Sequence, residues 1–392
     1  MKSIIRFVYL KEDIMIYLDN AATSFPKPNQ VYDEMINCLK NYCANPGRSS
    51  HNMAIETDMK IMESRDTIAR LFNIENPLNI IFTKNATEAL NIGIKGLLKS
   101  GDHVISTCIE HNSVLRPLNT MSKNNVEVTF LNVSKDGYLD IEELKKHIKL
   151  ETKAIIINHA SNVLGAVQDI NAIGHIAKDH GIIFMVDASQ SAGNIKIDVE
   201  EDNIDLMAFP GHKSLLGPQG TGGLYVSGAI NLNKYTEGGT GSNSHSMEQP
   251  DFLPDKFESG TLNTPGLVGL CEGVKFIEKI GVEIIHKYEM ALLQCLLEEL
   301  NKLKFIKIYG PNNCKNRCSV VSLNIEGFES SEVGYRLNES GIAVRTGYHC
   351  APLIHNIIDT KNMGTVRISP GYFNTFNDIY AIVASIKYIY NS

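Results

Sequence analysis

The stretch IIFMVDASQ, at residues 182–190, decides how this chain folds. Its uninterrupted apolar run predicts a strand that is buried on both faces, and the strand ends on a carboxylate, Asp187. Similar short runs alternate with helical patterns on either side, at residues 80–82, 103–106, 126–131, 154–158, 206–209 and 224–226. This alternation predicts crossover connections and a mainly parallel seven-stranded sheet, in an α/β fold with helices on both faces of the sheet.

The order of these patterns divides the chain into a large domain and a smaller one. Residues 1–14 indicate an N-terminal extension, because their apolar run is short and interrupted, and a strand-like pattern begins only at Ile16. We expect residues 15–30 to pack with the small domain, residues 31–265 to form the large domain, and residues 266–392 to form a small α/β domain. Residues 236–264 are rich in Gly, Ser, Asn and Pro without periodicity, which predicts a functional segment or one packed on a neighbouring subunit.

Composition excludes several classes of protein. The 392 residues include 37 Lys and Arg against 44 Asp and Glu, a formal net charge of −7, which argues against a nucleic-acid partner. No apolar run is long enough to predict a membrane span, so we expect no membrane partner. The 8 cysteines lack a regular framework and indicate thiols in a cytoplasmic protein. Cys314 and Cys318 have no second pair nearby, so no metal site is expected.

Two strand ends carry groups that suit a phosphorylated, cationic ligand. After the first strand, Asn85 or Thr87 begins a helix whose free amides would bind an anion, although this segment taken alone favours an ordinary helix cap. After the strand at residues 182–186, Asp187 is either a helix cap or the partner of a cationic ligand atom. Each segment alone leaves its two interpretations open.

A third strand end adds an amine, and the combination is more informative than its parts. Lys213 follows the run at residues 206–209 beside His212 and several glycines, a setting in which a lysine can be an activated amine. A phosphate cradle, a carboxylate and a lysine are what pyridoxal phosphate requires, because the acid protonates its pyridine nitrogen and the lysine forms a Schiff base. The glycine fingerprints of dinucleotide-binding and P-loop proteins do not occur in the sequence.

One cysteine stands apart from the other seven. Cys350 lies in a segment punctuated by Gly347 and Pro352, which predicts a loop, and Arg345 or a protonated His349 would favour its thiolate. The other cysteines lie mostly in apolar patterns, where a thiol usually packs as a small hydrophobic side chain. Position therefore selects Cys350 as the candidate nucleophile.

Seven motifs together resemble one family. They are YLDNAATS at 17–24, NATEALN at 85–91, EHNS at 110–113, SNVLG at 161–165, VDASQSAG at 186–193, GHK at 211–213 and RTGYHCAP at 345–352. From residue 16 to the C-terminus the chain resembles the class V, fold-type I pyridoxal-phosphate enzymes, and among them the group II cysteine desulfurases and selenocysteine lyases. The resemblance implies the fold-type I architecture and a homodimer with shared active sites.

The resemblance also implies roles for residues around the cofactor. Lys213 matches the Schiff-base lysine, Asp187 the partner of the pyridine nitrogen, and His111 the imidazole that stacks on the ring and assists proton transfer with a pKa near working pH. Gln190 and Asn162 match the groups that hydrogen-bond the ring hydroxyl. The remaining matches are phosphate ligands: Ala86, Thr87, His212 and, from the other subunit, Thr261.

The implied reaction converts L-cysteine into L-alanine. The substrate carboxylate requires a planar cation, for which Arg367 matches the family's arginine and Arg345 is a second candidate, with Asn162 also at the substrate. Cys350 would take the sulfur as a persulfide and pass it to an acceptor protein or a small thiol. Pro210 departs from the pattern, because the family usually has Ser or Thr there as a phosphate ligand, and proline removes both the hydroxyl and the N–H.

Three alternatives keep the cofactor site but change the function. A selenocysteine lyase would act on L-selenocysteine without an obligatory enzyme thiol. A class V aminotransferase or epimerase would make Cys350 incidental. A non-enzymatic scaffold would only bind the cofactor, although the presence of Lys213, Asp187 and Gln190 speaks against it.

Overall fold

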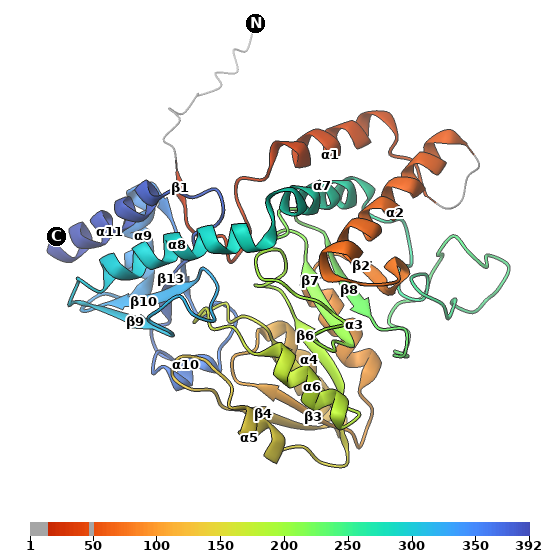
Figure 1. Cartoon of the computed structure of the whole chain (residues 1–392), viewed down its shortest axis with the longest axis horizontal. Helices are drawn as coiled ribbons and strands as arrows, with labels where there is room; N and C mark the ends of the chain where they lie inside the picture. The colour runs from red at the N-terminus through yellow and green to blue at the C-terminus, as the bar shows by residue number, and fades with distance from the viewer. Residues whose placement is uncertain (1–14, 47–50) are drawn as a thin grey trace, which may run out of the picture.

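A computed structural model describes residues 15–46 and 51–392 of the chain. Its larger part is built on one sheet (Figure 1), whose strands are β2 (Ile80–Thr83), β3 (His103–Thr107), β4 (Glu127–Leu131), β5 (Thr152–Asn158), β6 (Ile183–Asp187), β7 (Leu206–Pro210) and β8 (Gly222–Val226). The order is β2-β8-β7-β6-β5-β3-β4, and only the pairs that β8 makes are antiparallel. The predicted mainly parallel seven-stranded sheet is confirmed.

Alternate residues of the strands enter two separate cores, as the twofold period of a strand requires. Ile80 and Phe82 belong to one core, which includes side chains of α2 (Asn52–Phe72), α6 (Ile170–Asp179) and α7 (Thr264–Ile280). Ile81 belongs to the other, with side chains of α3 (Ala86–Leu97) and α4 (Asn112–Lys123). Both faces are therefore covered, as the buried strand patterns predicted. The remaining elements here are α1 (Asn29–Asn41), which packs along α7, α5 (Ile141–Lys146) and the short 3₁₀ turn η1 (Pro77–Asn79).

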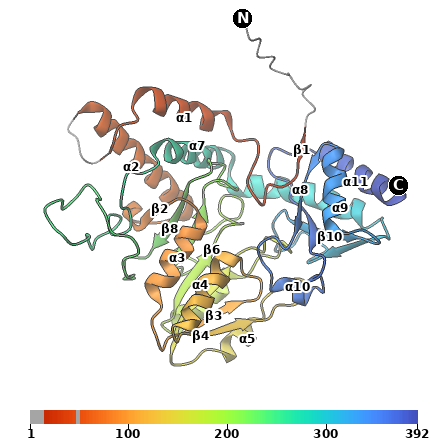
Figure 2. The ribbon, with the colours of Figure 1, turned by 180° about the vertical axis from the view of Figure 1, so that it is seen from behind.

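The C-terminal part forms a third core around a second sheet (Figures 1 and 2). This sheet is antiparallel, in the order β12 (Arg345–Gly347), β13 (Thr365–Ile368), β10 (Val321–Ile325) and β9 (Ile306–Tyr309). Its helices are α8 (Val282–Leu300), α9 (Ser330–Glu339), α10 (Ile354–Ile357) and α11 (Phe376–Asn391). Near the N-terminus, β1 (Ile16–Tyr17) pairs in parallel with β11 (Ile342–Ala343), so the start of the described chain lies against this C-terminal part.

The sequence patterns missed some details of this architecture. The small domain begins with two consecutive helices, α7 and α8, because Gly281 adopts φ 97°, which ends α7. β11 and β12 have only two and three residues, and β9 has four with Lys307 among them, so these strands gave no clear signal. Residues 236–263 hold neither helix nor strand, as their composition indicated. The predicted extension at residues 1–14 lies outside the described residues. No helix in the described part of the chain has the length and apolar character needed to cross a bilayer.

Candidate active site

The carboxyl ends of neighbouring strands gather the groups that the sequence singles out. β6 ends on Asp187, and β7, its parallel neighbour, leads through Pro210 to His212 and Lys213. β2, on the far side of β8, leads into α3 through Asn85. Because β2, β7 and β6 run in the same direction, their carboxyl ends open onto one edge of the sheet, where ligands of open α/β sheets bind.

The start of α3 offers free backbone amides. Asn85 caps the helix by accepting a hydrogen bond from the amide of Glu88 at 2.9 Å. Within the described residues, the amides of Ala86 and Thr87 have no acceptor, so they can bind an anion. A Cβ at Gly222 of β8 would lie 2.9 Å from the carbonyl carbon of Asn85, so only glycine permits this close approach.

His111 caps α4 and is held in one tautomer. Its Nδ1 accepts a hydrogen bond from the amide of Ser113 at 3.0 Å, which leaves the ring proton on Nε2. The Ser113 hydroxyl lies 2.9 Å from the same Nδ1 and 2.7 Å from the Thr87 hydroxyl, so the two predicted ligands are linked. Burial lowers the pKa of His111 to about 4, and the imidazole is neutral at working pH. The expectation of a pKa near working pH is wrong, because burial disfavours the charged ring.

Lys213 lies where charges of both signs converge. Burial lowers the pKa of its amine to about 8, while the nearby Asp187 carboxylate raises it. The cations Arg367 and Arg345 lower the pKa further, and Cys350 raises it. These groups come from the large sheet and from the C-terminal part, and the fold brings all of them within electrostatic reach of the lysine. Asp187 itself is only 2% exposed.

Glu110 is a site residue that sequence reasoning missed. Its buried carboxylate accepts hydrogen bonds from the Thr107 hydroxyl at 2.6 Å and from the Asn158 amide at 3.1 Å, which ties the ends of β3 and β5 together. Burial raises its pKa to about 8, and the negative charge of Asp187 raises it further. The sequence does place this carboxyl next to His111, just after a strand, which could have marked it as a site residue. Nothing in the sequence indicated that Glu110 is buried.

Residues 23–27 hydrogen-bond to the backbone of His212 and Lys213, in the segment after β7 that we call the lysine loop. Sequence reasoning also missed these contacts. The carbonyl of His212 accepts hydrogen bonds from the Thr23 hydroxyl at 3.1 Å, the Ser24 amide at 3.1 Å and the Lys27 ammonium at 2.7 Å. The Ser24 hydroxyl donates to the carbonyl of Lys213 at 2.8 Å. Burial lowers the pKa of Lys27 to about 7. The position of the loop therefore depends on side chains far away in sequence.

The predicted cofactor ligands Gln190 and His212 differ in whether their polar atoms already have hydrogen-bond partners. The Gln190 amide donates to the carbonyl of Ala21 at 2.9 Å, so one of its polar groups is already used. His212 Nδ1 is buried and has no hydrogen-bond partner in the described part of the chain. Burial lowers the pKa of His212 to about 4, so its ring is neutral. An unpaired buried nitrogen at this place is a vacant ligand-binding group.

Arg367 is buried and only partly paired. Its Nη2 donates to Asp19 at 2.7 Å and its Nη1 to the carbonyl of Asn162 at 3.1 Å, while Nε has no partner among the described residues. The Asn162 amide donates to the carbonyl of His349, and its buried Oδ1 is likewise unpartnered within that part. The two predicted substrate groups therefore adjoin, and each keeps one polar atom unused.

The Cys350 loop is docked against the start of α4. The carbonyl of Cys350 accepts from the Asn112 amide at 2.7 Å, and Arg345 donates from Nη2 to the Cys350 sulfur at 3.4 Å. His349 and Cys350 have φ of 51° and 61°, a conformation that non-glycine residues rarely adopt and that clusters at functional sites. Burial lowers the pKa of His349 to about 2, so the suggestion that a protonated His349 favours the thiolate is wrong.

Thr261 makes no hydrogen bond to these groups within the described residues. It is exposed and lines a hollow with Thr83 and Lys84. Three residues earlier, the buried Glu258 pairs with Arg65 and accepts from the Phe82 amide at 2.6 Å, which fixes this segment on β2. The predicted role of Thr261 in a partner's site stays a prediction.

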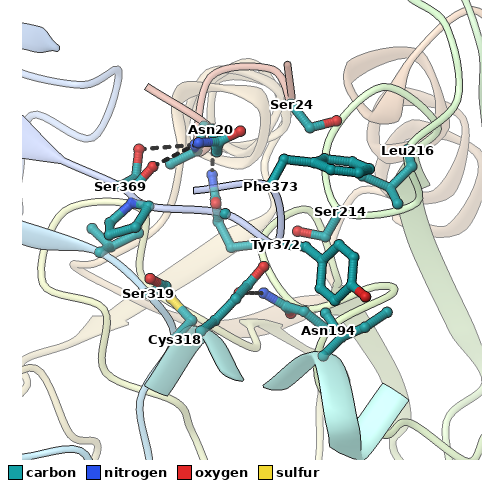
Figure 3. Close-up of a pocket in the computed structure, with 17 residues that line it drawn as sticks. Asn20, Ser24, Asn194, Ser214, Leu216, Cys318, Ser319, Ser369, Tyr372 and Phe373 are labelled. Carbon is teal, nitrogen blue, oxygen red and sulfur yellow. Dashed lines mark hydrogen bonds between the residues drawn. The ribbon is translucent and has the colours of Figure 1, made fainter. Parts of the chain in front are cut away.

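A cavity with Gln190 in its lining lies between the N-terminal segment and the C-terminal part (Figure 3). Deep in its wall, Glu289 of α8 accepts from the Asn194 amide at 3.2 Å and from the backbone of Tyr372. Burial raises the pKa of Glu289 to about 7. Further lining residues are Asn20, Ser24, Ser214, Ser319, Ser369 and Phe373.

The remaining cysteines do not all pack as predicted. Cys38, Cys108, Cys271 and Cys318 are buried, in agreement with the prediction. Cys295 and Cys314 are half-buried, and Cys43 is exposed. The prediction is wrong for Cys43, which lies just beyond the end of α1 and is exposed.

With this geometry in hand, comparisons with known proteins give one consistent result. The family model described as aminotransferase class-V matches residues 16–382. A probable cysteine desulfurase of Methanothermobacter thermautotrophicus is 35% identical over 384 residues, 95% of this chain and 94% of that protein. A probable cysteine desulfurase of Pyrococcus abyssi is 35% identical and covers 96% of this chain and 95% of its own.

Solved structures agree with the sequence matches. The apo cysteine desulfurase from Thermococcus onnurineus NA1 superposes with a TM-score of 0.92 and 34% identity, covering 96% of this chain and 95% of that one. The cysteine desulfurase CsdA from Escherichia coli gives a TM-score of 0.86 and 26% identity over the same shares.

Proposed function

The chain belongs to the aminotransferase class V family, and from this premise we propose that it is a cysteine desulfurase, which converts L-cysteine into L-alanine. The sulfur passes to a persulfide on Cys350 and then to an acceptor. The docked Cys350 loop carries this proposal: a cysteine in a rare backbone conformation accepts a hydrogen bond from Arg345, within electrostatic reach of Lys213. A thiol of merely structural importance needs none of these features.

The residues of the site fit pyridoxal phosphate. The free amides of Ala86 and Thr87 and the unpaired His212 nitrogen suit its phosphate. Asp187 suits the pyridine nitrogen, and Lys213 suits the aldehyde. When bound, the cofactor supplies an electron sink that makes the substrate's α-proton removable and its Cβ–S bond cleavable.

The chain's own residues divide the remaining work. The buried guanidinium of Arg367, with Nε unused, binds the substrate carboxylate beside Asn162, and Arg345 serves as an additional cation. Lys213, whose pKa is lowered to about 8, is partly a free amine near neutral pH and accepts the α-proton. His111 is neutral with its proton on Nε2, so it donates a hydrogen bond and holds no extra proton to transfer.

Cys350 performs the sulfur transfer. Its thiolate attacks the substrate sulfur, and the bond from that sulfur to Cβ breaks as the new S–S bond forms. The carbon fragment takes up one proton at Cβ, regains the α-proton from Lys213 at Cα and leaves as L-alanine, while the transferred sulfur stays on Cys350 as a persulfide. A thiol, on an acceptor protein or a small molecule, then attacks that outer sulfur and restores Cys350.

The proposal includes a homodimer with shared active sites. Thr261 is exposed on a segment that Glu258 and Arg65 anchor, so a second copy can receive it. Exposed apolar side chains on α1 and α2, such as Leu39 at 63% and Met59 at 68%, support a covered face there. We also propose that the large and small domains divide at residue 265. We further propose a cytoplasmic location, which the absence of disulfides among the described residues supports.

The alternatives are not favoured. The relatives are described as cysteine desulfurases and not as selenocysteine lyases, aminotransferases or epimerases. The Arg345 contact to Cys350 also has no purpose in an enzyme whose thiol is incidental.

The decisive experiment measures two products from cysteine in matched variants. Purified protein with Schiff-base absorbance should form alanine and sulfide in equal amounts, in the presence of a reducing thiol. Lys213→Ala should lose both products together with the absorbance, and Cys350→Ser should keep the absorbance but lose desulfuration. Cys43→Ser, which removes an exposed cysteine away from the site, is the control and should behave as wild type. Undiminished sulfide formation by Cys350→Ser would contradict the proposed mechanism.

A further inference from the structure

His355 is a buried histidine that the proposed reaction does not use. It belongs to the short helix α10, which follows the Cys350 loop, and it is 0% exposed. Its Nδ1 lies 2.6 Å from the hydroxyl oxygen of Thr360, and its Nε2 lies 3.2 Å from the carbonyl oxygen of Tyr348. Because both ring nitrogens have partners, the orientation of the imidazole is fixed, and one of its contacts reaches the loop of Cys350.

The two partners determine which nitrogen of His355 carries the proton. Burial lowers the pKa of His355, so the ring is neutral and has a single N–H group. A carbonyl oxygen can only accept a hydrogen bond, so the contact to Tyr348 requires the proton on Nε2. Nδ1 is then an acceptor, and the Thr360 hydroxyl is its donor. Thr360 therefore fixes the tautomer of His355 that donates to Tyr348.

The carbonyl of Tyr348 begins the turn that carries Cys350. The same carbonyl accepts from the Ala351 amide at 3.0 Å, which closes the turn over residues 348–351. Inside this turn, His349 and Cys350 have φ of 51° and 61°. Side chains other than glycine are strained at such angles, and the conformation persists only where surrounding contacts hold it. The hydrogen bond from His355 to the first carbonyl of the turn is one of these contacts.

Further contacts hold the same turn from two sides. The Tyr348 ring meets the His355 ring edge-on, with centroids 5.1 Å apart, and the Tyr348 hydroxyl donates to the carbonyl of Lys361. On the other side, the Asn162 amide donates to the carbonyl of His349. Asn162 belongs to the proposed substrate site, whereas His355 is outside the proposed cofactor and substrate groups. His355 can therefore be changed without removing any of those groups.

We propose that His355 is a positioning residue for Cys350: it holds the carbonyl of Tyr348, with its own proton kept on Nε2 by Thr360, and thereby keeps the Cys350 sulfur aimed at the substrate. A nucleophile reacts quickly only from a position close to its target, so a displaced turn costs rate even when the thiol is intact. The inference rests on the proposed function, because it takes Cys350 as the group that receives the sulfur.

Two substitutions separate the two ends of the imidazole. In His355→Gln, the side-chain amide extends to the place of Nε2, so it can still donate to Tyr348 but loses the contact to Thr360. In His355→Asn, the shorter amide reaches only the place of Nδ1, so it can still bond to Thr360 but loses Tyr348. Each variant loses one hydrogen bond, so a merely structural role predicts equal turnover per folded molecule in both. The positioning role predicts slower turnover in His355→Asn.

A second pair of substitutions acts on the tautomer. Thr360→Val removes the hydroxyl that keeps the proton on Nε2, and Thr360→Ser retains that hydroxyl. This pair leaves His355 itself unchanged. It gives the same comparison if His355→Asn does not fold.

The test compares these holoproteins, matched by their Schiff-base absorbance, with wild type. Each is mixed with L-cysteine at several concentrations without a reducing thiol, and mass spectrometry follows the persulfide on Cys350 during the first turnover. Hydrogen–deuterium exchange of the peptide covering residues 348–351 is measured on the same proteins before cysteine is added. Exchange reports how firmly the turn is held, and persulfide formation reports what that hold contributes to the reaction.

We expect His355→Asn to form the persulfide about tenfold more slowly than wild type, with faster exchange in the turn and the same half-saturating concentration of cysteine. His355→Gln should stay within about threefold of wild type, because the contact to Tyr348 remains. Thr360→Val should be slower than Thr360→Ser.

Equal persulfide rates in His355→Asn and His355→Gln would overturn the inference, and so would unchanged exchange of the turn in His355→Asn. The proposed function is judged separately, on wild type and Cys350→Ser. If wild type forms no persulfide from cysteine, that function fails, and the exchange rates still decide whether His355 holds the turn.

Discussion

Arg345 and Arg367 are direct cross-strand partners in the small antiparallel sheet, opposite each other on β12 and β13. The Arg345 guanidinium donates to the Cys350 sulfur. The Arg367 guanidinium donates to Asp19 and to the carbonyl of Asn162. The register of two short strands therefore fixes the spacing between the nucleophile and the proposed carboxylate site. Two cations side by side also lower the pKa of the Lys213 amine, after the larger effect of burial.

Removing the Arg345 guanidinium should slow the reactions of Cys350 without unfolding the loop. The hydrogen bond stabilises negative charge on the sulfur, and hydrogen bonds to charged groups contribute about 1.5–3 kcal/mol. We expect Arg345→Ala to lower the alkylation rate of Cys350 roughly tenfold at neutral pH, from about 1.4 kcal/mol. Arg345→Lys should recover part of that rate. An alkylation rate equal to wild type in Arg345→Ala would show that the contact has no chemical effect.

The apoprotein should bind pyridoxal phosphate faster as pH rises through 8. The free amine of Lys213 is the reactive form, and burial lowers its pKa to about 8. Asp187 opposes this effect, since its negative charge stabilises the ammonium. Asp187→Asn should therefore move the midpoint of the rate to lower pH. Stopped-flow absorbance at several pH values measures the midpoint, and a midpoint that stays near 10 in wild type would contradict the prediction.

The fold could be predicted from sequence because its signals are local. Each buried strand of the large sheet is a short apolar run, and the run ends where the polar site residues begin. Pro210, His212 and Lys213 lie in one short segment, so their shared strand end could be inferred from that segment alone. The small sheet was less predictable, since β12 carries Arg345 and has no apolar pattern.

The parts of the site that sequence did not predict depend on burial and on long-range contacts. From sequence alone, His111 and His349 are each expected to have a pKa near neutral pH. Only the packed structure shows that burial lowers these pKa values. Lys27 and Glu110 act through backbone groups of remote segments. Such contacts leave no periodicity, because a backbone carbonyl or amide places no constraint on the residue type that presents it.

Lys27 should help to hold the lysine loop in place. Its ammonium donates to the carbonyl of His212 at 2.7 Å and to the Ser24 hydroxyl at 2.6 Å. Below pH 7, where the amine with its pKa of about 7 is protonated, we expect Lys27→Met to weaken cofactor binding by about tenfold, as loss of a charge-assisted hydrogen bond of roughly 1.5 kcal/mol implies. Lys84→Met, at an exposed lysine, is the control. Equilibrium dialysis measures the cofactor dissociation constant, and equal constants for both variants would refute the role.

Replacing Pro210 should strengthen phosphate binding. Pro210 ends β7 two residues before His212 and offers neither hydroxyl nor N–H. We expect Pro210→Ser to lower the cofactor dissociation constant by about tenfold, because a hydroxyl bond to a charged phosphate is worth roughly 1.5 kcal/mol. Pro210→Ala restores the N–H alone and separates the two contributions. If Pro210→Ser leaves the constant unchanged, the account of Pro210 as a missing phosphate ligand fails.

The buried acid of α8 should make the protein less stable as pH rises. Glu289 is 5% exposed, and burial raises its pKa from 4.5 to about 7. The folded state therefore holds a proton that the unfolded state releases above pH 4.5. Stability from this group is complete below 4.5 and is lost progressively as pH rises to about 7, and the shift corresponds to a loss of about 3 kcal/mol.

Glu289→Gln mimics the protonated acid and should remove this dependence. We expect the unfolding free energy of the variant to exceed that of wild type by an amount that grows between pH 5 and 7 and then stays constant, with about 3 kcal/mol as its upper limit. Chemical denaturation at each pH measures the difference. Glu283→Gln, at an exposed position of the same helix, should show no such growth. A difference that is the same at pH 5 and pH 8 would mean that Glu289 is ionised in the folded protein, with the Asn194 amide and the Tyr372 backbone sufficient to stabilise its charge.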